Sequence, residues 1–405
     1  MAHLRERYLS RIAGKLLSAS PIVGIVGQRQ TGKTTLVEGI AKEYVSLDDE
    51  EQLELARRSA KVFVDHRASP FAIDECQLSP ALFPALKERV RVHRAHGQYI
   101  LTGSVRFTSV GEIRESLTGR IIDLELLPLS LSELYHLPLT DIQSIAKAQD
   151  PLPLLRRNPF SSPGSVQKFA LFLERGGLPG ICFIHSESVR VRKMRAHIRT
   201  ILDRDLRQVT RTTLDYLSLK TFLEEIALQQ DEVFDLARAA RGARIAVNTA
   251  RKVLSALEAV FLVRVIHKEG DTSGRQVFLE DQGMSTFLLA ERGQRVALHA
   301  GATRDWTRLL FQQLLAQVNY RDDLHSGIFS FRKRGGARIE LGVRLDGRIV
   351  GYSVGAGQAA SASQIRSAGS FQARFKNARV FLLHRGTSFR KLGDNLFEAP
   401  FGSVL

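Results

Sequence analysis

Four residues near the N-terminus have the types and the spacing of a phosphate-binding loop. Gly27, Gly32, Lys33 and Thr34 match the pattern G-x-x-x-x-G-K-[ST] within GIVGQRQTGKTTL, residues 24–36, between an apolar run and a helical one. In such a loop, backbone N–H groups at a helix N-terminus surround phosphate oxygens, the lysine reaches the terminal phosphates and the hydroxyl binds Mg²⁺. A glycine-rich turn before a helix is the alternative. We expect ATP to bind at Gly27, Gln28, Arg29, Gln30, Thr31, Gly32, Lys33, Thr34 and Thr35.

Two later apolar runs end in the other side chains that ATP chemistry needs. FAIDE ends in Asp74 and Glu75, and YILTGS ends in Ser104. We assign Thr34 and Asp74 to Mg²⁺, because P-loop enzymes hold the metal with the loop hydroxyl and a carboxylate at a strand end. Glu75 is assigned to polarising the attacking water. Ser104, or Thr102, is assigned to contact with the γ-phosphate, although an ordinary strand-to-loop turn explains this position nearly as well.

Arg120 is the candidate for a cation that stabilises the transferring phosphoryl group. It lies in LTGRI and would act within its own chain or on a neighbouring subunit. A solvated arginine is an equally good interpretation of this residue.

The runs that must position these residues alternate between strand and helix patterns. Between residues 22 and 127, short β-rich apolar runs are separated by helical stretches. This alternation predicts an α/β fold with a parallel sheet that helices cover on its faces. A proline-rich stretch at residues 140–165 predicts a loop or linker, and helical patterns resume after it.

The second half of the chain predicts two further units. Residues 214–284 have the patterns of three short helices and a β-hairpin that turns at EGDTSG, which together are typical of a winged helix. From residue 303 onward, one helix and several strands predict an α/β unit.

The predicted third helix of the winged helix carries side chains that suit duplex DNA. A recognition helix presents polar and basic residues to the major groove, and the candidates here are Arg241, Arg244, Asn248, Thr249, Arg251 and Lys252. Residues 190–211 add eight basic residues, several of them on one helical face. A winged helix that only contacts protein, and a basic helix face that is only solvated, are the alternatives.

The composition limits the environment and the partners. The 405 residues carry a formal net charge of +16 and a pI near 10.2, which favours polyanions such as nucleic acid. Cys76 and Cys182 are the only cysteines, which excludes a disulfide framework. The first residues lack the apolar core of a signal peptide, and no apolar run is long enough for a membrane span. We expect a cytoplasmic protein that does not associate with membranes.

The chain resembles a prokaryotic family of AAA-type P-loop ATPases with a C-terminal DUF4143 region. The matching words are GQRQTGKTTL, YVSLDD, FAIDECQ, ILTGS, SLTGRIIDLELLPLSLSEL, RGGLP, LDRDL and QVFLEDQGM, in family order. The resemblance implies an AAA core at 1–140, a linker and helical region at 141–213, a winged helix at 214–290, and a domain similar to PD-(D/E)xK nucleases at 291–405.

The terminal domain is expected to keep a nuclease-like fold without cutting nucleic acid. In the resemblance one strand carries Asp and the next carries Glu-x-Lys, and the two acids hold Mg²⁺. Here those positions are Glu340, Ser353 and Gly355, and Gln312 stands where the preceding helix often offers Glu. The alternative is a shifted register in which Glu340, Asp346 or a loop acid forms another site.

These residues support three functions. The first is a Mg²⁺-dependent ATPase whose nucleotide state controls binding to DNA, or to a protein on DNA. The second is a slow nucleotide switch that recruits a protein partner, as an antitoxin-like or defence component would. The third is an ATP-coupled nuclease. A protein partner and a homo-oligomer are compatible with all three.

Overall fold

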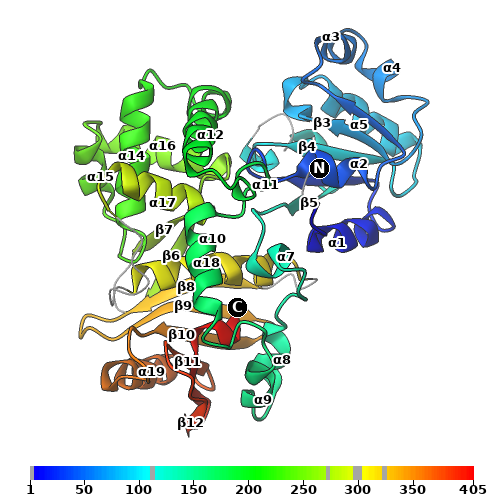
Figure 1. The fold of residues 1–405 in the computed structure, drawn as a ribbon. Helices are drawn as coiled ribbons and strands as arrows, with labels where there is room; N and C mark the ends of the chain where they lie inside the picture. Colours follow the sequence, from blue (N-terminus) through cyan, green and yellow to red (C-terminus); the bar gives the residue numbers. More distant parts are fainter. Residues whose placement is uncertain (1–3, 110–114, 271–273, 295–302, 322–325) are drawn as a thin grey trace.

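The chain folds into three parts. The computed structural model describes residues 4–109, 115–270, 274–294, 303–321 and 326–405. Figure 1 shows an N-terminal domain in blue and cyan, a helical unit in green beside it, and a C-terminal domain in orange and red below the helical unit. The helical unit is the segment from α10 to α17, residues 165–291.

The N-terminal domain is built on a parallel sheet. Its five described strands lie in the order β2-β3-β4-β1-β5, and every neighbouring pair is parallel. The strands are β1 (Ile22–Val26), β2 (Glu43–Ser46), β3 (Phe71–Asp74), β4 (Tyr99–Gly103) and β5 (Ile121–Glu125). β1, β3 and β4 are buried along their whole length, as in sheets with helices on both faces. The predicted α/β fold with a parallel sheet is confirmed.

Helices complete this domain and lead out of it. Those of the N-terminal domain are α1 (Tyr8–Leu17), α2 (Lys33–Glu38), α3 (Glu50–Arg58), α4 (Ala60–Val64) and α5 (Leu82–Val92). The short helices α7 (Leu131–Leu134), α8 (Ile142–Lys147) and α9 (Leu152–Arg156) then run toward the C-terminal domain (Figure 1). Ser130 and Glu133 form a reciprocal capping box that starts α7.

The helical unit contains one irregular turn. Its helices are α10 (Ser165–Arg175), α11 (Pro179–Cys182), α12 (Glu187–Thr200), α13 (Leu206–Val209), α14 (Tyr216–Leu228), α15 (Leu236–Gly242), α16 (Val247–Ala259) and α17 (Gln282–Glu291). Between α12 and α13, residues Ile201–Asp205 form a π-helical turn. Single π turns inside helices often mark functional positions, because the extra residue redirects the side chains around it.

The predicted hairpin joins the C-terminal sheet. β6 (Val263–Gly270) and β7 (Arg275–Leu279) pair antiparallel, while the turn at 271–273 lies outside the described residues. β6 also pairs parallel with β8, so one described sheet runs β12-β13-β11-β10-β9-β8-β6-β7. The predicted boundary between residues 290 and 291 lies in α17 and separates β6 and β7 from the other strands of the same sheet. The three helices and the hairpin form as predicted, but their function as a winged helix stays a prediction.

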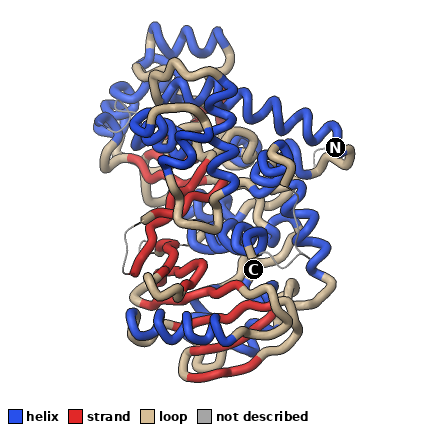
Figure 2. Tube along the Cα trace, turned by 90° about the vertical axis from the view of Figure 1, so that its left-hand side faces the viewer, coloured by secondary structure: helices blue, strands red, loops and turns tan. Residues whose placement is uncertain are grey.

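The C-terminal domain packs a helix on each face of this sheet, as Figures 1 and 2 show. Its elements are α18 (Arg304–Asn319), β8 (Gly327–Arg332), β9 (Arg338–Leu345), β10 (Arg348–Val354), α19 (Ala362–Arg374), β11 (Arg379–His384), β12 (Arg390–Gly393) and β13 (Leu396–Pro400). Along β11, Phe381 and Leu383 belong to the core around α18, whereas Val380 and Leu382 belong to the core around α19. The period of two is that of a strand buried on both faces. Its likeness to nucleases stays a prediction.

The words RGGLP and QVFLEDQGM meet in the helical unit. The Asp281 carboxylate accepts hydrogen bonds from the backbone N–H of Gly177 at 2.7 Å and of Met284 at 2.8 Å. A Cβ at Gly176, which has a φ of 71°, would lie 2.4 Å from an Asp281 oxygen. Burial raises the pKa of Asp281 to about 6. These two words therefore encode the packing of α10 against α17.

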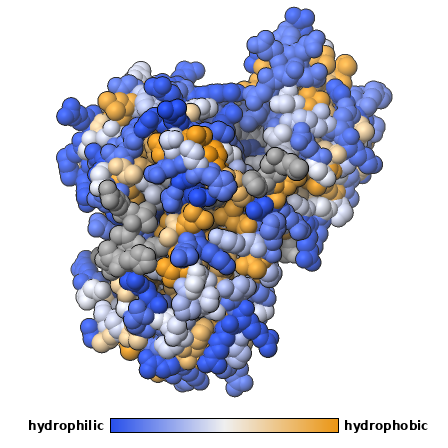
Figure 3. Space-filling view, viewed as in Figure 1, coloured by the Kyte–Doolittle hydropathy of each residue, from blue (hydrophilic) through white to orange (hydrophobic). Residues whose placement is uncertain are grey.

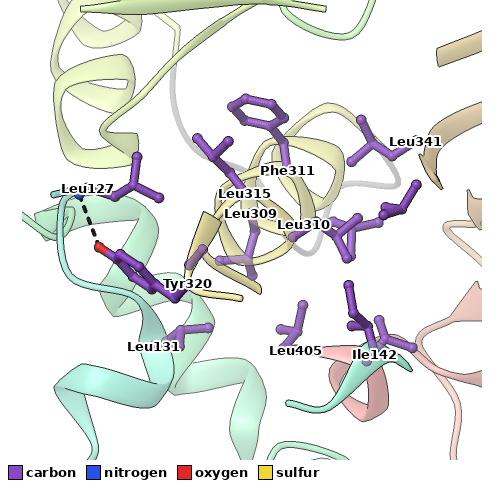
Figure 4. Packing of buried hydrophobic residues seen from close by; sticks show 14 of the residues in the cluster. Leu127, Leu131, Ile142, Leu309, Leu310, Phe311, Leu315, Tyr320, Leu341 and Leu405 are labelled. Atoms are coloured by element: carbon purple, nitrogen blue, oxygen red, sulfur yellow. Dashed lines mark hydrogen bonds between the residues drawn. The ribbon is translucent and has the colours of Figure 1, made fainter. Parts of the chain in front are cut away.

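Arg7, which directly precedes α1, joins the N-terminal domain to α7 and to the C-terminal domain. Its guanidinium donates to Glu133 Oε1 at 2.9 Å, to the carbonyl oxygens of Thr31 at 2.6 Å and Leu127 at 2.5 Å, and to the Tyr320 hydroxyl at 3.4 Å. The Tyr320 hydroxyl, at the end of α18, also accepts the Leu127 N–H at 3.0 Å (Figure 4). These contacts lie at the edge of the largest apolar core, which runs from α1 to the C-terminus.

The surface combines hydrophilic and apolar residues (Figure 3). Figure 3 shows hydrophilic residues over most of the visible face, with apolar residues gathered in its middle, between the three parts. In the part of the chain that the structure describes, no helix has both the length and the apolar character to cross a bilayer.

We expect Tyr320→Phe to lower the free energy of unfolding by about 1 to 2 kcal/mol, because it leaves the buried Leu127 N–H without an acceptor. Chemical denaturation of both proteins measures this. Tyr135→Phe is the matched control, since the Tyr135 hydroxyl makes no hydrogen bond within the described residues and its ring packs edge-on against Phe160. Equal effects of the two substitutions would contradict the role of the Tyr320 hydroxyl.

Candidate functional site

The P-loop connects β1 to α2 at the carboxyl edge of the parallel sheet. Gly32 has a φ of 95° and directly precedes α2, so the loop turns into the helix N-terminus through a conformation that glycine adopts without strain. The Lys33 ammonium is buried and donates to the carbonyl oxygens of Gly27 at 2.9 Å and Gln28 at 3.1 Å. Burial lowers the pKa of Lys33. The lysine thus lies across the loop, where phosphate oxygens are its natural partners.

The residues assigned to Mg²⁺ are already in contact. Thr34 Oγ1 donates to Asp74 Oδ2 at 2.8 Å, and the Tyr44 hydroxyl donates to the same oxygen at 2.8 Å. Thr102 Oγ1 donates to Asp74 Oδ1. A hydroxyl and a carboxylate at this separation fit a Mg²⁺ ion that takes its other ligands from phosphates and water. Among the described residues no group of three or more His, Cys, Asp or Glu side chains forms a metal cluster.

Glu75 is held in an unusual backbone conformation beside Ser104. Its φ of 53° lies in the left-handed region, which is strained for a side chain of this size. The Glu75 carboxylate accepts from Ser104 Oγ at 3.2 Å and from Gln77 Nε2. The structure therefore places Asp74, Glu75, Thr102 and Ser104 together opposite the P-loop, as their strand-end positions predict.

Residues from the helical unit cover the P-loop, which the sequence analysis missed. Arg29 Nε donates to Asp205 Oδ2 at 3.0 Å, and one Arg29 Nη donates to Asp205 Oδ1 at 3.4 Å. Gln28 Nε2 lies 3.4 Å from His197 Nε2. Pro179, at the start of α11, lies close to Gly32. The word LDRDL, residues 202–206, belongs to the family resemblance, but only the fold shows that its second acid, Asp205, reaches the phosphate loop.

The same π turn makes a second, more exposed contact with the N-terminal domain. Arg204 donates to Asp48 Oδ1 at 2.8 Å, and both side chains are about half exposed. Asp205 is buried, in contrast, and its partner Arg29 is largely buried. The π turn thus directs the consecutive side chains of Arg204 and Asp205 to two different residues of the N-terminal domain, Asp48 and Arg29.

Arg120 does not lie at this site. It precedes β5, whose first residue Ile121 pairs with Ile22, the first residue of β1. The P-loop follows the last residue of β1, so Arg120 lies at the opposite edge of the sheet, about 13 Å away along the strand. Its Nη1 donates to the Thr118 carbonyl at 3.4 Å. Arg120 therefore does not reach the phosphate loop of its own chain in this structure, and a role on a neighbouring subunit stays a prediction.

The candidate DNA-binding residues form one exposed surface at α15 and α16. Arg241, Arg244, Asn248, Arg251 and Lys252 are exposed, and Thr249 is half-buried. Arg251 and Lys252 line a groove of about 460 Å³ against Val209 and Thr210. Whether this surface binds DNA stays a prediction.

Most of the basic residues between 190 and 211 have partners within the chain. Arg190 pairs with Glu174, Arg195 with Glu291 at 3.1 Å, and Arg204 with Asp48, while Arg207 donates to two backbone carbonyls. Arg192, Arg195 and Arg199 stay exposed on α12, so a phosphate-binding ridge on this helix face stays a prediction.

Glu340 and Ser353, the aligned nuclease positions, line a pocket of about 230 Å³ between β9, β10 and the start of α19. Glu340 accepts the Val354 N–H at 2.9 Å and pairs with Arg338 at 2.8 Å. Burial raises the pKa of Glu340. Gln312 is buried on α18 and does not line this pocket. The predicted absence of nuclease activity remains untested.

Comparison with protein families supports the N-terminal assignment. Residues 19–135 match a family described as an AAA domain. Together with the parallel sheet and the P-loop, this match supports an AAA-type ATPase domain in the N-terminal part of the chain.

The expected DUF4143 region is wrong. Residues 166–289 match a family described as a domain of unknown function, DUF8612. The words that suggested DUF4143 in this segment encode packing contacts, such as those of Asp281 with Gly177, and short words of that kind do not decide between two families.

Two relatives and one solved structure are similar to the chain. Uncharacterised proteins of Mycobacterium tuberculosis and Mycobacterium bovis are each 26% identical over 402 residues, which is 96% of this chain and 82% of the relative. A Walker-type ATPase of Pyrococcus abyssi is 13% identical, covering 69% of this chain and 94% of its own, with a TM-score of 0.40. At that TM-score the likeness supports no argument.

His197 makes the cover of the P-loop sensitive to pH. Burial, then the positive charges of Arg29 and Lys33, lower the pKa of His197 to about 4, against about 6.5 in an unfolded chain. The unfolded chain therefore binds the proton more readily, and folding stability is lost as pH falls below about 6.5. Between pH 7.5 and 5 the wild type should lose about 1 to 2 kcal/mol more than His197→Gln. Exposed His96→Gln is the control and should follow the wild type; parallel profiles for all three proteins would contradict this.

Proposed function

We propose that the protein is a Mg²⁺-dependent ATPase. The observation that supports this most directly is the contact of Thr34 with Asp74, with Lys33 on the same loop and Glu75 beside Asp74. The match of residues 19–135 to AAA domains agrees with it.

The proposed chemistry assigns one role to each of these side chains. Lys33 and the P-loop N–H groups would bind the β- and γ-phosphates, while Thr34 and Asp74 would hold Mg²⁺, which would supply positive charge against the phosphates. Glu75 accepts a proton from the water that attacks the γ-phosphorus. The bond to the bridging oxygen breaks with its electron pair on ADP. Ser104, which donates to Glu75, keeps that carboxylate turned toward the γ-phosphate.

Lys33→Ala should abolish measurable ATP binding, whereas Glu75→Gln should bind ATP but turn over about 10² to 10⁴ times more slowly. The first substitution removes contacts with the bound phosphates, and the second removes only the proton acceptor. Equilibrium binding of a fluorescent ATP analogue and phosphate release measure the two effects. Exposed Lys42→Ala is the control. Equal loss of binding in both variants would contradict these roles.

We further propose that nucleotide state controls DNA binding by α16. Ser104 is two residues from Arg106, whose backbone N–H donates to the Ala259 carbonyl at 2.8 Å and whose Nε donates to the Glu258 carbonyl at 3.1 Å. The loop that follows β4 beside the proposed γ-phosphate position is thus hydrogen-bonded to the end of α16. A shift of Ser104 on hydrolysis would reach the helix that carries Arg251 and Lys252.

Duplex DNA should bind with an affinity that falls steeply with salt, because each phosphate contact contributes about 0.9 to the slope of log affinity against log salt. Arg251→Ala/Lys252→Ala should weaken binding and reduce this slope by about 2. Fluorescence anisotropy at several salt concentrations, with ATP, ADP or no nucleotide, measures this. The control Arg366→Ala/Lys376→Ala removes two exposed charges from the other end of the molecule.

Two outcomes would redirect this proposal. No salt-dependent binding by the wild type at low ionic strength, or equal effects of the two double variants, would contradict DNA binding at α16. Turnover that is slow and indifferent to DNA would instead favour a nucleotide switch that recruits a protein partner.

A further inference from the structure

Arg29 projects from the P-loop into the charged space around the phosphate site. Burial lowers the pKa of Lys33 and the positive charge of Arg29 lowers it further; the same charge also acts on His197. Burial lowers the pKa of Arg29, but its hydrogen bond with Asp205 and the negative charges of Asp205 and Glu75 raise it by more, so that the pKa of Arg29 is raised overall. Arg29 follows Gly27 by two residues within the P-loop, and its guanidinium is largely buried against Asp205 beside that loop.

Two other arginines that could serve the phosphate site, Arg7 and Arg120, are engaged elsewhere or too distant. Arg7 uses its three nitrogens on Glu133, on two carbonyl oxygens and on Tyr320. Arg120 lies at the opposite edge of the sheet. Arg29 differs, because Nε and one Nη hold Asp205, and its other Nη has no acceptor within the described residues.

Asp205 fixes the direction of the Arg29 side chain. The carboxylate accepts from two nitrogens of one guanidinium, an arrangement that orients the planar group. Asp205 is itself buried and fixed by the π turn of Ile201–Asp205. Next to this pair, Gln28 Oε1 and His197 Nδ1 are buried without a partner among the described residues. Unpaired buried polar atoms are unfavourable. A water molecule bound to phosphate would donate to Gln28 Oε1, and His197 Nδ1 would hydrogen-bond to such a water.

We propose that Arg29 is a catalytic residue that stabilises the transferring phosphoryl group within its own chain, and that Asp205 of the DUF8612 segment is its positioning residue. This inference rests on the proposed ATPase function. As water adds to the γ-phosphorus and the bond to ADP breaks, negative charge increases on the oxygens at the breaking bond. The Nη of Arg29 that Asp205 leaves available donates to those oxygens. The DUF8612 segment thus completes the active site of the AAA domain.

The test compares turnover with binding of the ground state and of a transition-state mimic. Arg29→Gln should lower kcat by about 10³-fold, the low end for a stabilising arginine. The Kd for ADP should change less than about threefold, whereas the gain in ADP affinity from added aluminium fluoride should be lost. Asp205→Asn should lower kcat by about 10- to 100-fold, because it frees the guanidinium to rotate. Asp205→Glu should restore part of the loss.

The neighbouring contact between the same two segments supplies the matched control. Arg204→Gln and Asp48→Asn each break an ion pair between the π turn and the N-terminal domain, without touching the P-loop. Both variants should keep wild-type kcat and aluminium fluoride affinity. Thermal unfolding and ADP binding confirm that every variant is folded.

Each outcome decides the question. If Arg29→Gln has wild-type kcat, or loses ADP and ADP–aluminium fluoride binding equally, Arg29 is not catalytic although the ATPase proposal stands. If Arg204→Gln lowers kcat as much as Asp205→Asn, then Asp205 acts only as a structural contact. If the wild type shows neither turnover nor a gain in affinity from aluminium fluoride, the ATPase proposal fails and Arg29 fails with it.

Discussion

The buried guanidinium of Arg7 holds the P-loop, the exit of β5, α7 and the end of α18 together. A buried cation is tolerated only when its donors are paired, because the charge loses its hydration. Glu133 supplies the opposite charge, while acceptors from the P-loop, the exit of β5 and the end of α18 supply the rest. Separating any of these segments would leave the charge partly unpaired. Together with the apolar core that runs from α1 to the C-terminus, this one side chain therefore ties the P-loop to the C-terminal domain.

The phosphate site is shared between two segments of unlike sequence character. The N-terminal domain contributes the groups that we propose do the chemistry, namely Lys33, Thr34, Asp74 and Glu75. The DUF8612 segment contributes the cover, through the contacts of Asp205 with Arg29 and of His197 with Gln28. Because these contacts are polar and partly unsatisfied, their strength depends on the charge that occupies the site. A segment without a nucleotide motif of its own thereby contacts the loop that we propose binds the nucleotide.

The two sheets of the chain are also linked by ion pairs. Glu125, at the end of β5, pairs with Arg106 and with Arg264 of β6, and Glu280 pairs with Arg264 at 2.9 Å. β6 in turn belongs to the eight-stranded sheet of the C-terminal domain. This buried charge network links the carboxyl edge of the nucleotide sheet to the hairpin and to α16. Movement of the nucleotide sheet would therefore reach both the α16 surface and the terminal domain.

The sequence by itself determined the P-loop, its strand-end acids and the parallel sheet, because these follow from spacing within a few residues and from the period of apolar residues. It also predicted the three helices and the hairpin. It could not show that Arg29 meets Asp205 or that Asp48 meets Arg204, since residues more than 150 positions apart form these pairs. Nor could it show that Arg120 lies at the far edge of the sheet, which depends on the register of β1 with β5. Only the tertiary structure brought these distant charges together, because burial requires Asp205 to find a partner and the chain alone does not say that Arg29 is that partner.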